Sequence, residues 1–309
     1  MNSCDRVAVC SRSFSKHPVL RAELLKRYEN VTFNDSGLQL SGDSLINFLS
    51  GHDLAITALE KIDEYVISRL PQLRVISKYG VGLDMIDMTA ISKYGKQLGW
   101  TGGVNCRSVA ELTLAFAIIM LRKILKANQE LVDGIWRQHV GGQLSGRTIG
   151  VIGCGSVGKD LVRLLQPFGC KLLVNDIVCY DDFYRSHNVL SVSFDELLRN
   201  SDLITIHVPL DETTRGMIGA NQFGLMRTNS ILINTSRGGI VDEPALKNAL
   251  LSGSIAGAAF DVFNTEPPED FELISLSNFL ATPHIGGSAE EAIVAMGMAA
   301  IKGLESSPA

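Results

Sequence analysis

The sequence predicts an α/β protein with two doubly wound domains, each built on a parallel β-sheet with helices on both faces. Its 309 residues amount to roughly twice the usual length of one domain. Hydrophobic residues make up 46% of the chain and charged residues 20%, so two cores can be buried. Short β-branched runs alternate with amphipathic helical patterns, which is typical of parallel strands joined by crossover helices.

The alternation falls into two series. In the first we expect strands at residues 7–9, 31–33, 54–56 and 74–76, and helices near 18–28, 43–49 and 62–70. The second opens at Thr148, with strands expected at 149–152, 172–175, 203–208, 231–234, 256–260 and 279–281. Between the two series, residues 109–129 are expected to form one long, largely apolar helix that bridges the domains.

The charge balance argues against nucleic acid and membranes as partners. Lys and Arg number 28 against 33 Asp and Glu, which gives a formal net charge of −5 without any basic run. The amino terminus lacks the layout of an export signal, and the most apolar stretch contains Glu111, Arg122 and Lys123. The six cysteines are scattered, with no Cys-x-x-Cys pair and no histidine cluster, so we expect a cytoplasmic protein without a bound metal.

A glycine-rich sequence directly follows the first strand of the second series. It reads Gly153-Cys154-Gly155-Ser156-Val157-Gly158 and leads into a helical pattern. In a dinucleotide-binding turn the first glycine turns the chain, the second lets the backbone approach a pyrophosphate, and the third lets helix and strand pack closely. Glycines also close ordinary turns, so this motif needs further support.

Asp176 supplies that support. It ends the next expected strand, close to the spacing of about 20 residues at which a carboxylate binds the adenosine ribose. A carboxylate there favours NAD, because it repels the additional phosphate of NADP, and residues 177–179 contain no arginine that would bind one. The alternative is an ordinary turn residue at a strand end.

Three more residues with acid–base or charged side chains follow predicted strand ends, where open α/β sheets bind their ligands. The planar guanidinium group of Arg237 can bind a carboxylate through two parallel hydrogen bonds, although a single arginine is often only a surface charge. His284 can donate and recover the proton that accompanies hydride transfer, and Glu266 is the candidate carboxylate that orients it and holds its charged form. The sequence does not show that the two side chains touch.

With these residues the chain resembles the D-isomer-specific 2-hydroxyacid dehydrogenases, most closely the branch that includes D-3-phosphoglycerate dehydrogenases. The resemblance runs from about Leu54 to about Glu291. The motifs that carry it follow one another in the family's order: 78–84, Asn105 with 108–111, the glycine motif with Asp176, 207–210, 234–238, 261–267 and 283–286.

The resemblance implies a Rossmann NAD-binding domain of residues 102–284, inserted into a flavodoxin-like substrate domain of residues 1–101 and 285–309. It implies NAD as the cofactor, no metal, and interconversion of a D-2-hydroxy acid with its 2-oxo acid. The activity would be phosphoglycerate dehydrogenase-like or glyoxylate/hydroxypyruvate reductase-like. His284 would be the acid/base, Glu266 its partner, and Arg237 would bind the substrate's carboxylate and C2 oxygen.

The same resemblance assigns further binding residues. Asp261 would receive the nicotinamide carboxamide, and the loop at Gly80 would offer backbone N–H groups to the substrate carboxylate. The implied cofactor positions beyond the glycine motif and Asp176 are His207, Val208, Pro209, Thr213, Thr235, Ser236, Arg237, Asp261, His284 and Gly286. The implied substrate positions are Tyr79, Gly80, Val81, Asn105, Arg237 and His284.

One departure from the family bears on the substrate. Phosphoglycerate enzymes of this family carry an Arg-Ser pair just after the third strand, and this pair binds the phosphate of the substrate. At the corresponding place, residues 57–59, this chain has Thr-Ala-Leu. We therefore expect any anionic tail to be held by Arg12, Lys78 or Arg107, with Arg12 preferred, although each is equally explained as a solvated charge. No feedback by serine through an appended domain is expected.

A non-catalytic NAD(H)-sensing protein of the corepressor type is the alternative function, because this fold also occurs in such regulators. The long tails and basic faces expected of them are not visible in the sequence. The partner expected is a small 2-oxo or 2-hydroxy acid, with no nucleic acid and no membrane. A homodimer formed through the NAD-binding domain is also expected.

Overall fold

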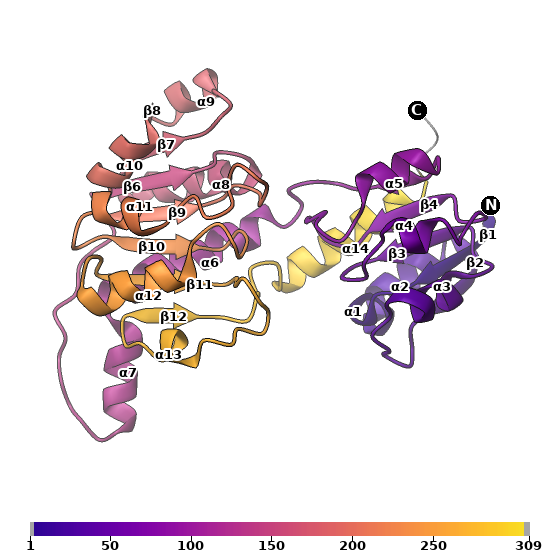
Figure 1. The fold of residues 1–309 in the computed structure, drawn as a ribbon, viewed down its shortest axis with the longest axis horizontal. Coiled ribbons are helices and arrows are strands. Elements are labelled where there is room, and N and C mark those ends of the chain that lie inside the picture. Colours follow the sequence, from indigo (N-terminus) through magenta and orange to yellow (C-terminus); the bar gives the residue numbers. More distant parts are fainter. Residues whose placement is uncertain (1–2, 306–309) are drawn as a thin grey trace. The chain divides into compact units, whose positions relative to one another are not determined.

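The computed structural model describes residues 3–305 and divides into two compact units (Figure 1). Unit 1 contains the described residues up to Asn105 together with those from Ala289 onward, and unit 2 contains Cys106–Ser288. Among the described residues no helix is long and apolar enough to span a membrane. Each unit is an α/β domain with one parallel sheet, so the predicted fold class is confirmed.

The sheet of unit 1 has the strand order β2-β1-β3-β4-β5, with every neighbouring pair parallel. This is the flavodoxin-like order, in which the direction of winding reverses between β1 and β3. The strands are β1 (Ser3–Val9), β2 (Tyr28–Phe33), β3 (Leu54–Thr57), β4 (Val75–Lys78) and β5 (Gln97–Gly99). The helices are α1 (Arg12–Lys16), α2 (Pro18–Leu25), α3 (Gly42–Leu49), α4 (Glu64–Ile67), α5 (Met88–Lys93) and α14 (Glu290–Gly303).

Alternate residues of β1 divide the core of unit 1 between two faces. Val7 and Val9 belong to the cluster that includes residues of α2 and α14, whereas Ala8 and Cys10 belong to the cluster that includes α3, α4 and α5. All four side chains are fully buried. This two-sided burial explains why residues 7–10 are all apolar and do not alternate between apolar and polar residues.

The sheet of unit 2 has the order β12-β11-β10-β9-β6-β7-β8, again parallel throughout. It is the doubly wound Rossmann order with a seventh strand, and it reverses between β6 and β9. The strands are β6 (Thr148–Ile152), β7 (Lys171–Asn175), β8 (Val189–Ser191), β9 (Leu203–Ile206), β10 (Ile231–Asn234), β11 (Gly257–Phe260) and β12 (Phe279–Ala281). The helices are α6 (Cys106–Arg122), α7 (Ile124–Val132), α8 (Ser156–Leu165), α9 (Asp181–Ser186), α10 (Phe194–Asn200), α11 (Ala220–Leu225), α12 (Glu243–Ser252) and α13 (Phe271–Ile274).

Three details differ from the sequence expectations. The single helix expected over 109–129 is wrong: Lys123 adopts a left-handed conformation with φ 55°, which ends α6 and lets α7 leave in another direction. The helix expected near 18–28 ends at Leu25, because Tyr28 begins β2 and its ring enters the core. The three-residue strands β5 and β8 were not expected at all.

A close approach of two glycines ties the last helix to the sheet of unit 1. Gly99 lies on β5 and Gly303 in the last turn of α14, and a methyl carbon built on Gly99 would overlap the carbonyl group of Gly303. The Ser77 hydroxyl on β4 donates to the Ala300 carbonyl at 2.6 Å, which holds the same helix in place. Helix α14 therefore packs on the sheet closely enough that β5 has no room for a side chain there.

We predict that Gly99→Ala destabilises the protein by about 1–3 kcal/mol, the usual cost of overpacking a close contact. Thermal denaturation followed by circular dichroism measures the change. Gly224→Ala on α11 is the matched control, because a methyl group there meets no atom within 4 Å. A Gly99→Ala protein as stable as the wild type would show that α14 does not pack on β5 in this way.

Candidate active site

The glycine motif forms the turn between β6 and α8. Gly153 has φ 89°, and a Cβ there would lie 2.8 Å from the carbonyl carbon of His207. A Cβ on Gly158 would overlap the carbonyl oxygen of Gly153, so this glycine allows the helix to pack on the turn. A Cβ on Gly155 meets nothing within 4 Å, which leaves its backbone open on one side. The three positions thus have the shape that a pyrophosphate needs at a helix amino terminus.

Asp176 lies just past β7 and reaches back to the same turn. Its Oδ2 accepts a hydrogen bond from the backbone N–H of Cys154 at 2.5 Å, and its Oδ1 accepts one from Val178 at 2.8 Å. The carboxylate is therefore fixed beside the glycine turn. Burial raises the pKa of the Cys154 thiol to about 11, with a smaller contribution from the charge of Asp176, so this cysteine stays protonated and unreactive.

His207 follows β9 and has one unsatisfied ring nitrogen. Its Nε2 lies 2.9 Å from the Thr205 hydroxyl, whereas its Nδ1 is buried without a hydrogen-bond partner among the described residues. Burial lowers the pKa of His207 to about 3, so the ring is neutral near pH 7. A buried unpartnered nitrogen beside an open glycine turn fits a site completed by a bound cofactor.

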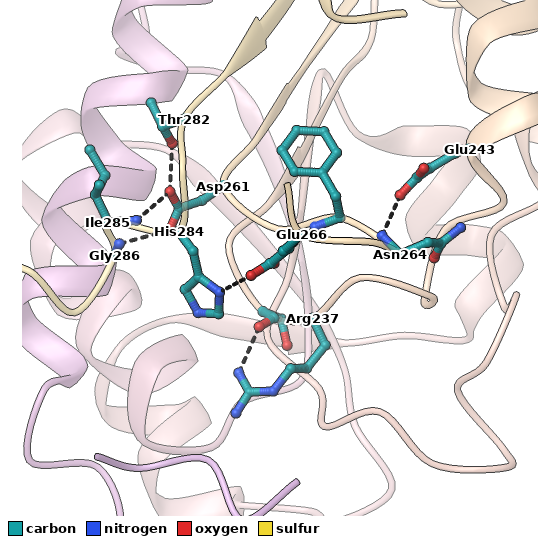
Figure 2. A network of polar contacts seen from close by, with 11 residues as sticks. Arg237, Glu243, Asp261, Asn264, Glu266, Thr282, His284, Ile285 and Gly286 are labelled. Atoms are coloured by element: carbon teal, nitrogen blue, oxygen red, sulfur yellow. Dashed lines mark hydrogen bonds and ion pairs between the residues drawn. The ribbon is translucent and has the colours of Figure 1, made fainter. Parts of the chain in front are cut away.

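The carboxylate of Asp261 organises the turn that follows β12. Its Oδ1 accepts hydrogen bonds from the Thr282 hydroxyl at 2.5 Å and the Ile285 N–H at 2.7 Å, and its Oδ2 accepts one from the Gly286 N–H at 2.7 Å (Figure 2). Its backbone carbonyl accepts the N–H of His284 at 2.9 Å. Asp261 is buried and its carboxylate already has three donors, so its visible role is to hold this turn.

The turn places His284 in contact with Glu266. His284 has φ 54°, a left-handed conformation that is unusual outside glycine and that the Asp261 contacts maintain. Its Nδ1 lies 2.9 Å from Glu266 Oε2, and the side chains of the two residues are 48% and 41% exposed. Glu266 Oε1 also accepts the N–H of Phe263 at 3.1 Å. The carboxylate is thus fixed, and Nε2 of the imidazole is the nitrogen that remains directed away from it.

Arg237 follows β10 on the same edge of the sheet. Its Nη1 donates to the Ser236 carbonyl at 2.7 Å, and its own carbonyl accepts from the side chain of Asn234 at 2.9 Å. Figure 2 shows its guanidinium extending into the same region of the view as the His284 ring. A cation and an acid–base pair at one sheet edge are suited to a substrate that has a carboxylate next to a carbonyl.

The other expected cofactor positions occupy the same carboxyl edge of the unit 2 sheet. Thr235 is buried next to Thr113, with their hydroxyl oxygens 2.9 Å apart, and Ser236 donates to the Val208 carbonyl. Thr213 is exposed in the loop after β9, where it donates to Asp211 at 2.6 Å. Val208, Pro209 and Gly286 lie in loops after strands, and Ser156 and Val157 are the first two residues of α8.

The remaining expected substrate positions lie in unit 1. Tyr79, Gly80 and Val81 follow β4, and Gly80 has φ 128°, a conformation that favours glycine. Lys78 is buried and its ammonium group donates to the Ala58 carbonyl. Arg12 is exposed at the start of α1, and Asn105 is the last residue before unit 2.

Arg107 has a structural partner. Its guanidinium makes a two-pronged ion pair with Asp160, at 2.7 and 3.0 Å. Asp160 lies on α8 and is 6% exposed, so Arg107 compensates a nearly buried carboxylate. This contact favours the structural explanation of Arg107 over the expected tail-binding role.

Glu243 is a residue that sequence reasoning missed. Its Oε1 accepts the backbone N–H of Asn264 at 2.7 Å, and Asn264 lies two residues before Glu266 (Figure 2). Burial raises the pKa of Glu243, with the Asn264 hydrogen bond opposing that effect. The only sequence signal was its place at the start of α12, which the helix amino terminus explains equally well.

Residues 114–286 match the family model described as D-isomer specific 2-hydroxyacid dehydrogenase, NAD binding domain. The chain belongs to this family. It is 36% identical to a D-3-phosphoglycerate dehydrogenase of Methanocaldococcus jannaschii over 282 residues, which are 90% of this chain and 54% of that protein. It is also 36% identical to a glyoxylate reductase of Thermococcus litoralis over 248 residues, covering 77% of this chain and 75% of that enzyme.

A solved structure of the family has the same fold. The D-lactate dehydrogenase of Aquifex aeolicus, complexed with NAD and lactic acid, superposes with a TM-score of 0.84 at 26% identity, covering 96% of this chain and 93% of that one. The expected resemblance is thus confirmed, and NAD is the cofactor of this dehydrogenase family domain. The chain spans about half the length of the phosphoglycerate dehydrogenases that it matches.

We predict that Asp176→Ala raises the dissociation constant for NADH by about tenfold, the loss expected from a charge-assisted hydrogen bond. In the same variant the affinity for NADPH changes less. Removing the carboxylate also removes its repulsion of the additional phosphate, and this gain offsets the loss of the hydrogen bonds that Asp176 makes to the glycine turn. Asp176→Asn is the control, since it keeps a hydrogen-bond acceptor and removes the charge. Fluorescence titration of both nucleotides measures the ratio, and equal wild-type affinity for the two would contradict the selectivity assigned to Asp176.

Proposed function

We propose that this protein is an NAD-dependent oxidoreductase that interconverts a D-2-hydroxy acid and its 2-oxo acid by hydride transfer. The observation that carries the proposal is the contact of 2.9 Å between His284 Nδ1 and Glu266 Oε2 at the carboxyl edge of the NAD-binding sheet. Redox chemistry at an alcohol carbon needs a proton donor and acceptor beside the cofactor. Three relatives named as dehydrogenases or reductases support the same reaction class.

His284 and Glu266 have different roles in proton transfer. Glu266 accepts a hydrogen bond from Nδ1 of the imidazole, which orients the ring, and the Nε2 proton is the one given to the C2 oxygen of the 2-oxo acid. In the reverse direction Nε2 accepts the proton of the hydroxyl group. When bound, NADH supplies the hydride that C2 receives.

Arg237 binds the substrate in this proposal. The planar guanidinium pairs with the substrate carboxylate and stabilises negative charge that develops on the C2 oxygen. The expected binding of a substrate carboxylate by the backbone N–H groups at Gly80 stays a prediction. Asp261 supports the site by fixing the turn of His284, and its expected contact with the nicotinamide carboxamide stays a prediction.

The substrate is therefore a small 2-oxo or 2-hydroxy acid, and the names of the relatives leave open which one. The alternative of a non-catalytic NAD sensor gains no support from these relatives. We place the enzyme in the cytoplasm, because all six cysteines are free thiols, as expected in a reducing compartment.

We predict that His284→Ala lowers kcat by about 10²- to 10⁴-fold, because the acid–base group is lost. The dissociation constant for NADH changes little. Oxidation of NADH with glyoxylate, pyruvate and hydroxypyruvate is the measurement. Glu266→Gln is the companion variant: it keeps a hydrogen-bond acceptor and removes the charge, so a smaller fall in kcat is expected. Normal turnover by His284→Ala would refute the assignment.

The homodimer that we propose uses the segment of residues 124–140 in unit 2, which we call the arm. Helix α7 has no buried residue, and Figure 1 shows it extending away from the sheet of its unit. Trp136 and Val140 are 82% and 89% exposed. The other exposed apolar side chains of the arm are Ile124, Leu125, Leu131, Val132 and Ile135. A patch of this kind on a soluble protein typically covers a partner surface, here a second copy of the chain.

We predict that the wild type is a dimer by light scattering and that Trp136→Asp shifts it toward the monomer. A buried charge in an apolar interface is costly, because it loses its hydration without gaining a partner. Leu251→Asp is the control, since Leu251 is an exposed leucine outside the arm, on α12. A monomeric wild type, or equal masses for all three proteins, would contradict the role of the arm.

A further inference from the structure

The loop that carries Glu266 is held by side chains and not by pairing of its own backbone. Among the described residues, no main-chain hydrogen bond joins residues 263–268 to another segment. The two prolines of this loop have no N–H group to donate. The chain is buried up to Phe263 and exposed over the next four residues, so a contact at Asn264 determines how the exposed part leaves the core.

Glu243 supplies that contact from outside the loop. Its Oε1 accepts the N–H of Asn264 at 2.7 Å (Figure 2). Within the loop, Glu266 Oε1 accepts the N–H of the neighbouring residue Phe263 at 3.1 Å. Two carboxylates therefore bind two consecutive amides, and the second of these carboxylates contacts His284 Nδ1 through its other oxygen.

The backbone from which Glu243 projects is itself fixed within unit 2. The N–H of Asp242 donates to the Ile218 carbonyl at 2.9 Å. The side chain of Asp242 accepts the N–H of Ala245 at 2.9 Å and so caps α12. Glu243 is the first residue of this capped helix, so its carboxylate reaches the loop from a rigid base.

The peptide group that Glu243 binds also packs against the loop of Arg237. A Cβ built on Gly238, the residue after Arg237, would overlap the carbonyl group of Phe263 and lie 2.6 Å from the nitrogen of Asn264. The peptide group that joins these two residues therefore lies against the glycine and donates to Glu243. Its orientation is fixed by two contacts, one steric and one polar.

Glu243 lies where a carboxylate needs a partner. The residue is half-buried, and burial raises its pKa, with the negative charges of Asp270 and Asp242 adding to the effect. The hydrogen bond from Asn264 acts in the opposite direction. Breaking this bond would leave a half-buried carboxylate beside two like charges, so the fold favours keeping the contact.

We propose that Glu243 is a positioning residue: by holding the amide of Asn264 it sets the direction of the Glu266 carboxylate and, through it, of the His284 ring. This inference rests on the proposed oxidoreductase function. Glu243 itself exchanges no proton with the substrate. The alternative is a local role, in which an acidic side chain stabilises the amino terminus of α12. The first role requires an acceptor that reaches Asn264, and the second requires a negative charge.

Two variants separate these requirements. Glu243→Gln keeps the length and an acceptor oxygen but loses the charge, whereas Glu243→Asp keeps the charge and is one methylene shorter. With the 2-oxo acid that the wild type reduces fastest, kcat should fall about tenfold in Glu243→Asp and stay within about twofold in Glu243→Gln. The dissociation constant for NADH should change little in both, because the glycine turn follows a different strand. The reverse order of the two variants would overturn the proposal.

A double variant shows whether the effect passes through Glu266. Glu266→Ala removes the side chain that the loop positions, so adding Glu243→Asp should then change kcat by less than about twofold. A tenfold loss that persists in this background would show that residue 243 acts elsewhere and would overturn the proposal. Glu196→Gln is the matched control: it removes an exposed acidic side chain from the first turn of α10, and kcat should not change.

Amide hydrogen exchange tests the contact without any turnover. The exchange of the Phe263 and Asn264 amides, followed by NMR, should become about tenfold faster in Glu243→Asp and stay unchanged in Glu243→Gln. Faster exchange at Asn264 alone would show that the contact does not reach Glu266, and equal rates in the wild type and Glu243→Asp would show that it does not hold the loop. Either result would overturn the proposal. A wild type that reduces no 2-oxo acid counts against the proposed function, whereas the exchange rates still decide the role of Glu243.

Discussion

The buried carboxylate of Asp261 is the interaction on which the candidate active site depends. Its hydrogen bonds to Thr282, Ile285 and Gly286 hold the turn after β12 in a conformation that gives His284 a positive φ. A left-handed histidine persists only where its surroundings determine it, since an unconstrained chain would relax to another conformation. The position of the imidazole beside Glu266 is therefore fixed by the fold before any ligand arrives.

The parts of the structure that the sequence predicts best are those that local chemistry determines. Six strands of the unit 2 sheet follow from continuous apolar runs, and the turn after β6 follows from the spacing of its three glycines. Gly153 and Gly158 occupy places where a side chain would meet the backbone, and Gly155 leaves its backbone open. Strands β5 and β8 have three residues each and lie at the edges of their sheets, so too few residues carry a pattern. The break at Lys123 has no glycine or proline to announce it.

Side-chain contacts between distant segments are the part that the sequence does not predict. Strand ends indicated that His284 and Glu266 belong to one edge, but the contact of 2.9 Å depends on two loops meeting. Glu243 lies 21 residues from Asn264 along the chain, and its position at the start of a helix suggests only a favourable charge.

The close contact between Gly99 and Gly303 has a consequence for the order in which the chain acquires its structure during translation. The ribosome completes β1 to β5 first, then the whole of unit 2, and only afterwards α14. Until that helix emerges, one face of the first sheet lacks the cover of Ala300 and Ile301. The inserted unit has all its strands in one continuous segment and can fold as it emerges, whereas the surrounding unit waits as a half-covered nascent domain, exposed to chaperones and to aggregation.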